Sequence, residues 1–204
     1  MKFKSEILIF LAAIAALVLL RQQNIGFKGS EKMSNAPPRT KPADPNRYEK
    51  AIFAAGCFWH VQYEFDHIPG VISTTVGYTG GTTENPTYKQ VCTGKTGHAE
   101  AIEIIYDPNR VSYEKLLNAF FENHDPTTLN RQGPDVGLQY RSAIFYYNDS
   151  QRQTALAAIK NLSKSNKYPN PVVTEVKPAG PFYQAEEYHQ KYLEKTGVSS
   201  CKTR

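Results

Sequence analysis

The chain contains 204 residues, of which 40% are hydrophobic and 21% are charged. These values indicate one globular domain with an extension and exclude a wholly disordered chain, while three cysteines are too few for a disulfide-stapled miniprotein. The net charge of +5 comes entirely from residues 1–48, where eight Lys and Arg residues outnumber three acidic ones. The remaining residues are electrically balanced, so the charge distribution argues against a nucleic-acid-binding protein.

The N-terminus combines a basic start with an apolar stretch. Lys2 and Lys4 precede residues 7–20, which are 14 consecutive residues without a polar side chain, and Arg21 ends the stretch. As a helix, this stretch would span about 21 Å, short of the ~30 Å core of a bilayer but typical of a signal sequence. No small-residue cleavage site follows it. We therefore predict an uncleaved signal anchor at residues 1–21, with a cleaved signal peptide and a helix buried in the fold as alternatives.

A linker separates this leader from the globular body. Residues 22–47 contain four prolines and few large apolar side chains, which predicts a flexible segment. Residues 48–204 then form the single folded domain, whose tail from about residue 197 is small and polar and should be mobile. We expect this domain to be soluble and to be exported or held at a membrane through residues 7–20, in a compartment that the sequence leaves open.

The body alternates strand and helix patterns in irregular order. Apolar or β-branched runs predict strands at residues 51–55, 71–78, 101–106, 141–147 and 172–176. Helical spacing and capping residues predict helices at 58–68, after Ser112, from Ser150 through Leu162, and at 183–196. Residues 79–98 and 123–139 are expected to be long loops, which are often functional. The whole pattern predicts an α+β fold, a two-layer, ferredoxin-like sandwich with a mixed β-sheet, behind the apolar helix and linker.

Cys57 lies where a predicted strand gives way to a predicted helix. The N–H groups and the dipole at a helix N-terminus favour an anion, so we expect this position to lower the thiol pKa and favour the nucleophilic thiolate. Gly56 carries no side chain that could block the sulfur, and Phe58 and Trp59 offer apolar faces for a small group. The alternative is a structural cysteine among core aromatic residues, because free cysteines often pack as small hydrophobic residues.

Two histidines could activate this thiol. Pairing of Cys57 with His98 or His124 would indicate a cysteine-dependent hydrolase or acyl transferase, although no cysteine-protease signature surrounds Cys57. The three cysteines are scattered and the five histidines lack ligand spacing, so we predict no metal site.

Seven short motifs occur along the body in one order: GCFW at 56–59, PGV at 69–71, GYTGG at 77–81, NPTY at 85–88, GHAE at 97–100, NHDP at 123–126 and QYRS at 139–142. Together they resemble the A-type peptide methionine sulfoxide reductase family over roughly residues 48–196. The resemblance implies an enzyme that reduces methionine S-sulfoxide, free or in proteins, to methionine and so repairs oxidised proteins. It implies no cofactor, and we expect a monomer.

The resemblance also assigns roles to individual residues. Cys57 would attack the sulfoxide sulfur and become a sulfenic acid, and Glu100 would protonate the sulfoxide oxygen, because a carboxyl in an apolar cleft has a raised pKa. By the same resemblance, Tyr88 and Tyr140 would be the hydroxyl donors to the sulfoxide oxygen. Phe58 and Trp59 would form the methyl pocket, and Asp135 would bind the substrate's backbone amide. Without the resemblance, Glu100 would be interpreted as a surface acid, the tyrosines as core residues and Asp135 as a turn residue.

Recycling requires a second thiol, and Cys201 lies four residues beyond Gly197 in the polar tail. The commoner family pattern has two tail cysteines, whereas only one is present here, so we predict a direct Cys57–Cys201 disulfide. Thioredoxin or a similar dithiol would reduce it. Cys92 is interpreted as structural or incidental. A non-enzymatic thiol redox sensor that signals through the same disulfide is a further alternative.

Overall fold

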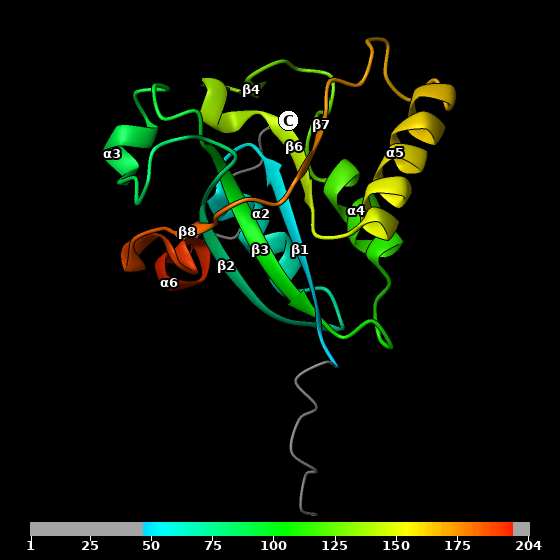
Figure 1. The fold of residues 1–204 in the computed structure, drawn as a ribbon, viewed down its shortest axis with the longest axis horizontal. Coiled ribbons are helices and arrows are strands. Elements are labelled where there is room, and N and C mark those ends of the chain that lie inside the picture. Colours follow the sequence, from blue (N-terminus) through cyan, green and yellow to red (C-terminus); the bar gives the residue numbers. More distant parts are fainter. Residues whose placement is uncertain (1–46, 198–204) are drawn as a thin grey trace, which may run out of the picture. The chain divides into compact units, whose positions relative to one another are not determined.

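A computed structural model of the chain describes residues 47–197 (Figure 1). The predicted signal anchor, all but the last residue of the linker, and Cys201 lie outside the described residues. Within residues 47–197, no helix has the length and apolar character needed to cross a bilayer.

Six strands form one mixed sheet in the order β7-β6-β1-β3-β2-β8. They are β1 (Glu49–Ala55), β2 (Val71–Thr79), β3 (Ala99–Tyr106), β6 (Ser142–Tyr146), β7 (Glu175–Pro178) and β8 (Tyr183–Gln184). Neighbouring strands are antiparallel except for β6 and β7, which are parallel. The four central strands follow the ferredoxin-like β-α-β-β-α-β order, so the predicted fold class is confirmed.

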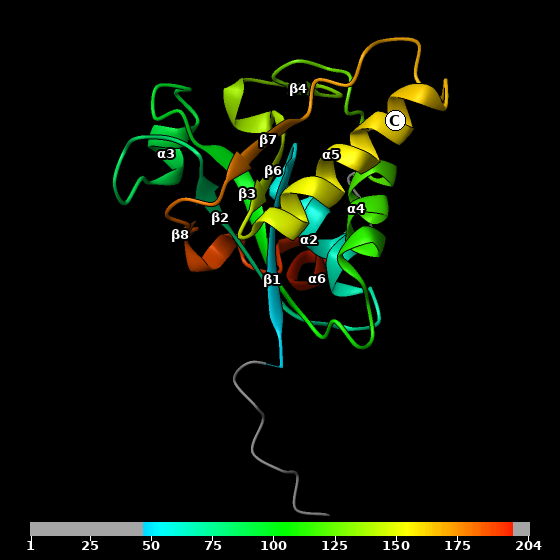
Figure 2. The same ribbon diagram turned by 45° about the vertical axis from the view of Figure 1, so that its right-hand side comes forward.

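The helices α2 (Phe58–Asp66), α4 (Tyr113–Glu122) and α5 (Asp149–Lys164) cover one face of this sheet. Figures 1 and 2 show α4 and α5 side by side. Shorter elements lie in the connections: α3 (Tyr88–Val91), the β4–β5 hairpin (Arg131–Gln132 and Asp135–Val136), η1 (Leu138–Tyr140), η2 (Glu187–His189) and α6 (Tyr192–Thr196). Both predicted long loops therefore contain short secondary structure.

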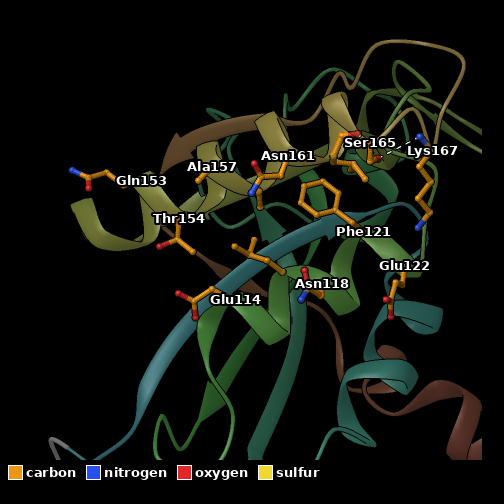
Figure 3. A pocket seen from close by; sticks show the side chains of 13 residues that line it. Glu114, Asn118, Phe121, Glu122, Gln153, Thr154, Ala157, Asn161, Ser165 and Lys167 are labelled. Carbon is orange, nitrogen blue, oxygen red and sulfur yellow. Dashed lines mark hydrogen bonds between the residues drawn. The ribbon is translucent and has the colours of Figure 1, made fainter.

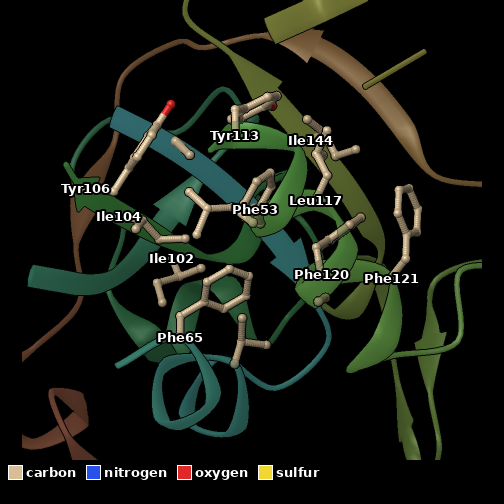
Figure 4. Close-up of a cluster of buried hydrophobic side chains, with 14 of the residues drawn as sticks. Phe53, Phe65, Ile102, Ile104, Tyr106, Tyr113, Leu117, Phe120, Phe121 and Ile144 are labelled. Atoms are coloured by element: carbon tan, nitrogen blue, oxygen red, sulfur yellow. The ribbon is translucent and has the colours of Figure 1, made fainter. Parts of the chain in front are cut away.

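Successive side chains of β1 point into two apolar layers, one on each face of the sheet. Phe53 points toward the helices and stacks on Phe120 of α4 with ring centroids 5.1 Å apart (Figure 4). Ile52 points to the opposite face, where Phe145 and Phe182 pack against it. The continuous apolar run of β1 is explained by this arrangement, because a strand between two others with both faces covered has no position for a polar side chain.

Two predicted boundaries were wrong for local reasons. Asn148, not Ser150, caps α5, and its side chain accepts a hydrogen bond from the Gln151 N–H. Ser150 already lies inside the helix. The strand predicted at 172–176 begins only at Glu175, because Val173 donates its N–H to Pro126 before the chain joins β6.

The helix predicted at 183–196 is not continuous. β8 pairs with the edge of β2, and Ala185 then donates its N–H to Val76. The side-chain amide of Gln190 accepts from the Val76 N–H and donates to the Val76 carbonyl, at 3.0 and 2.9 Å. The Val76 backbone at this edge of β2 provides hydrogen-bond partners that compete with helix formation. The segment therefore pairs along β2, forms only the single 3-10 turn η2, and becomes α-helical at α6.

Substitution of Phe53 tests the helix-side core. Because the ring is fully buried, Phe53→Ala should lower the free energy of unfolding by about 3–5 kcal/mol. Leu156→Ala on α5 is the matched control, since Leu156 is 44% exposed and its truncation should change that free energy by about 0.5 kcal/mol or less. Urea unfolding followed by circular dichroism measures both variants. Equal losses would contradict this packing.

Candidate active site

Cys57 occupies the turn between β1 and α2. It is the N-cap residue of α2, and its side chain is half-buried. Gly56 has φ +90°, and a Cβ atom there would lie 2.6 Å from Cγ of Gln132. Glycine is therefore required by the left-handed backbone and by the close approach of Gln132, rather than by access to the sulfur.

Glu100 is buried beneath the start of α2. It is the second residue of β3, it is 2% exposed, and its Oε2 accepts a hydrogen bond of 3.2 Å from the Phe58 N–H. Burial raises the pKa of Glu100 to about 8, although the Phe58 N–H partly opposes this effect. The carboxyl group is therefore mostly protonated at neutral pH and can donate a proton. The interpretation of Glu100 as a surface acid is wrong.

The Cys57 thiol has a raised pKa, contrary to the expectation from its position. Burial, and secondly the charge of Glu100, raise the pKa to about 12, whereas the N–H groups of Trp59 and His60 lower it. The effect of the helix N-terminus is therefore present but is outweighed by desolvation. In the free protein at neutral pH, the site holds a neutral thiol beside a mostly neutral carboxyl group.

Three further predicted residues come from separate segments and converge on this pair. Tyr88 begins α3 and Tyr140 ends η1, and the pKa of each phenol is raised by burial and by the nearby charge of Glu100. Asp135 of β5 raises the pKa values of both Glu100 and Cys57. The structure thus brings together one thiol, two hydroxyl groups and two carboxyl groups.

Phe58 and Trp59 form an aromatic wall beside the thiol. Phe58 is buried against Tyr78, and Trp59 stacks on Tyr192 of α6 with centroids 3.9 Å apart. The Trp59 indole N–H donates a hydrogen bond of 3.0 Å to Nδ1 of His189. His189 and Tyr192 were missed by sequence reasoning, because 130 residues separate Trp59 from His189 and no local pattern indicates such a contact.

Neither candidate histidine pairs with the thiol. His98 accepts a hydrogen bond from the Gly81 N–H, and its other ring nitrogen bonds the Thr83 carbonyl. His124 is bonded through both nitrogens to the Phe120 carbonyl and to Ser142, and burial lowers its pKa to about 4. Both rings instead hold backbone segments in place, which removes the basis for the hydrolase alternative.

Cys92 lies close to Tyr88 but is exposed at the end of α3. The position of Cys201 relative to Cys57 is not described. Among residues 47–197, no cluster of His, Cys, Asp or Glu could hold a metal ion.

A separate pocket of about 750 Å³ lies between α4 and α5 (Figure 3). Its lining includes Leu117 and Phe121 but none of the residues of the thiol site. Its lining contains no cysteine.

Comparisons with known proteins agree on one family. The family model described as peptide methionine sulfoxide reductase matches residues 49–204. The peptide methionine sulfoxide reductase MsrA of Methanothermobacter thermautotrophicus is 57% identical over 156 residues, covering 76% of this chain and 92% of the relative. Methionine sulfoxide reductase A of Corynebacterium diphtheriae has a TM-score of 0.72 at 38% identity, covering 80% of this chain and 81% of that one. Saccharomyces cerevisiae Mxr1 in complex with Trx2 has a TM-score of 0.51 at 28% identity, covering 76% and 91%.

The electrostatic coupling of Glu100 to Cys57 can be measured by alkylation. At pH 9, where Glu100 with a pKa of about 8 is ionised, Glu100→Gln should speed alkylation of Cys57 by iodoacetamide, because the charge that disfavours the thiolate is gone. We expect an increase of about 3- to 10-fold. At pH 6 the carboxyl group is neutral, so the two proteins should react alike.

The matched control is Glu103→Gln, which changes an acid on the opposite face of β3 that binds Lys50. It should leave the alkylation rate unchanged. Mass spectrometry of the Cys57 peptide separates this reaction from that of the exposed Cys92. Equal rates for Glu100→Gln and wild type at pH 9 would show that the two groups do not interact.

Proposed function

This chain belongs to the peptide methionine sulfoxide reductase family, and on that premise we propose that Cys57 and Glu100 carry its reaction, the reduction of methionine sulfoxide to methionine. The observation that supports this assignment is the pairing of a thiol with a mostly protonated, buried carboxyl group at the start of α2. Reduction of a sulfoxide requires both a nucleophile for sulfur and a proton for oxygen.

The first step transfers oxygen between sulfur atoms. As the Cys57 sulfur bonds to the sulfoxide sulfur, Glu100 donates its proton to the sulfoxide oxygen and takes up the proton that leaves the Cys57 thiol. The new hydroxyl group then passes to the Cys57 sulfur while its bond to the substrate sulfur and the sulfur–sulfur bond both break. Methionine leaves and Cys57 becomes a sulfenic acid, so the substrate gains the two electrons that the cysteine loses.

The surrounding residues bind the substrate in one orientation. The hydroxyl groups of Tyr88 and Tyr140 donate hydrogen bonds to the sulfoxide oxygen, while Phe58 and Trp59 receive the methyl group. Asp135 accepts a hydrogen bond from the backbone amide of the substrate. Because methyl and oxygen are held on different sides, the site favours one sulfoxide epimer, the S form, whether the methionine is free or in a protein.

Recycling passes through the C-terminal tail. The Cys201 thiol condenses with the sulfenic acid to form a Cys57–Cys201 disulfide and water. A dithiol of the thioredoxin type then reduces this disulfide by exchange. The complex of the similar yeast protein Mxr1 with Trx2 supports this class of reductant.

We also propose that residues 7–20 anchor or export an otherwise soluble, monomeric domain. The support is the basic start and the 14-residue apolar stretch, followed by a linker with four prolines. A domain on such a linker can reach oxidised proteins near a membrane surface.

The activity is tested with the two separate epimers of methyl p-tolyl sulfoxide and dithiothreitol. Wild type should reduce the S epimer, and Cys57→Ser should be inactive. Glu100→Gln should lose about 10²–10⁴-fold in turnover while substrate binding changes little, because general acid catalysis is lost. Near wild-type turnover by Glu100→Gln would show that the proton comes from another group.

Recycling is tested with Cys201→Ser. This variant should release one equivalent of methionine per enzyme and then stall with thioredoxin, because the sulfenic acid has no resolving thiol. Dithiothreitol should restore cycling, since a small thiol reaches Cys57 directly. Cys92→Ser is the matched control and should cycle normally. A Cys57–Cys92 disulfide in the non-reduced peptides would instead identify Cys92 as the resolving thiol.

A further inference from the structure

Glu186 connects the C-terminal segment to the element that carries Tyr88. Its Oε1 accepts a hydrogen bond of 2.9 Å from the Tyr88 backbone N–H, and its Oε2 accepts one of 2.8 Å from the Tyr78 hydroxyl group. One carboxylate therefore bridges β2, α3 and the stretch between β8 and η2.

The element that Glu186 holds is small. α3 has four residues, and it lies on the excursion between β2 and β3, at the left of the view in Figure 1. Thr87 and Gln90 form a capping box that stabilises the turn internally. This internal cap determines the shape of α3 but not its position relative to Cys57 and Glu100.

Two contacts tie α3 to the body of the protein by packing. Val91 is buried in a cluster with Phe58 and Tyr78, and the Tyr88 ring lies 4.4 Å from the ring of His189. Apolar contacts of this kind tolerate small rotations. The hydrogen bond that the Tyr88 N–H donates to Glu186 acts on the backbone of Tyr88 itself, so it restricts the direction in which the side chain leaves the helix.

Glu186 is suited to this task because it stays ionised. Partial burial raises its pKa, but hydrogen bonds from Tyr88, from its own N–H and from Tyr78 outweigh burial and lower it. Glu186 and Glu100 therefore have opposite states at neutral pH. Glu100 carries a proton that it can donate, whereas Glu186 offers two acceptor oxygens.

We propose that Glu186 is a positioning residue, whose carboxylate fixes the first residue of α3 and thereby aims the Tyr88 hydroxyl group at the sulfoxide oxygen. This inference rests on the proposed role of Tyr88. It adds to the site a residue that touches neither the substrate nor the reacting sulfur.

A double-mutant cycle tests the proposal. Glu186→Ala should lower kcat by about 10-fold or more with little change in KM, because the hydroxyl group is misplaced as the sulfur–oxygen bond breaks. Tyr88→Phe removes that hydroxyl group and should lower kcat by at least as much. The Glu186→Ala, Tyr88→Phe double variant should be no slower than Tyr88→Phe alone.

Two further variants separate positioning from stability. Glu186→Gln should retain most activity, because its amide oxygen can accept from the Tyr88 N–H and its amide nitrogen can donate to the Tyr78 oxygen. Glu187→Ala is the matched control, since Glu187 is an exposed neighbour that pairs with Lys195, and it should match wild type. The Cys57 alkylation rate at pH 9 should be the same in all these variants.

The outcomes are distinguishable. Wild-type turnover by Tyr88→Phe would remove the proposed role of Tyr88, whatever Glu186 does. If Tyr88→Phe is slow but Glu186→Ala slows both backgrounds by the same factor, Glu186 acts independently and the positioning proposal is overturned. Wild-type turnover by Glu186→Ala, or equal losses for the Ala and Gln variants, would overturn it as well.

Discussion

The hydrogen bond from the Phe58 N–H to the buried carboxyl group of Glu100 is the constraint on which the site depends. It joins β3 to the first turn of α2 and so places the acid next to Cys57, the N-cap residue. Burial then acts on both groups in the same direction, since desolvation disfavours each charged form. In the free protein at neutral pH, the Cys57 thiol is therefore protonated and the Glu100 carboxyl group is mostly protonated.

The segment from Glu186 to Gln190, near the C-terminus, contacts the site that β1, α2 and β3 begin. The side-chain amide of Gln190 binds the backbone N–H and carbonyl group of Val76 in β2, as a further strand residue would, and this contact holds the segment against β2. Its neighbours then contact the candidate site: His189 accepts a hydrogen bond from the Trp59 indole, and Glu186 accepts one from the Tyr88 N–H at the start of α3. The positions of the Trp59 indole and of α3 therefore depend on one short stretch of chain.

Local sequence was sufficient for elements whose partners are near in the chain. The helical spacing after Phe58 and the Ser112 cap of α4 each specify their element through contacts within a few residues. The continuous apolar run of β1 indicated a buried strand, although its partners β3 and β6 are distant in the chain. The same reasoning failed for residues 183–196, because helical spacing was present but the Val76 backbone, 114 residues away from Gln190, offered a competing set of hydrogen bonds.

The sequence by itself determined the family, through seven ordered motifs, and the placement of Cys57 at a strand–helix junction. It also identified Glu100, Tyr88, Tyr140 and Asp135 as candidates. Only the tertiary structure decided the protonation of the site, because the pKa of Cys57 is a balance between local N–H groups, which lower it, and burial by distant segments, which raises it more. Helix-terminus effects are encoded within one turn, whereas desolvation depends on every element that closes over the sulfur.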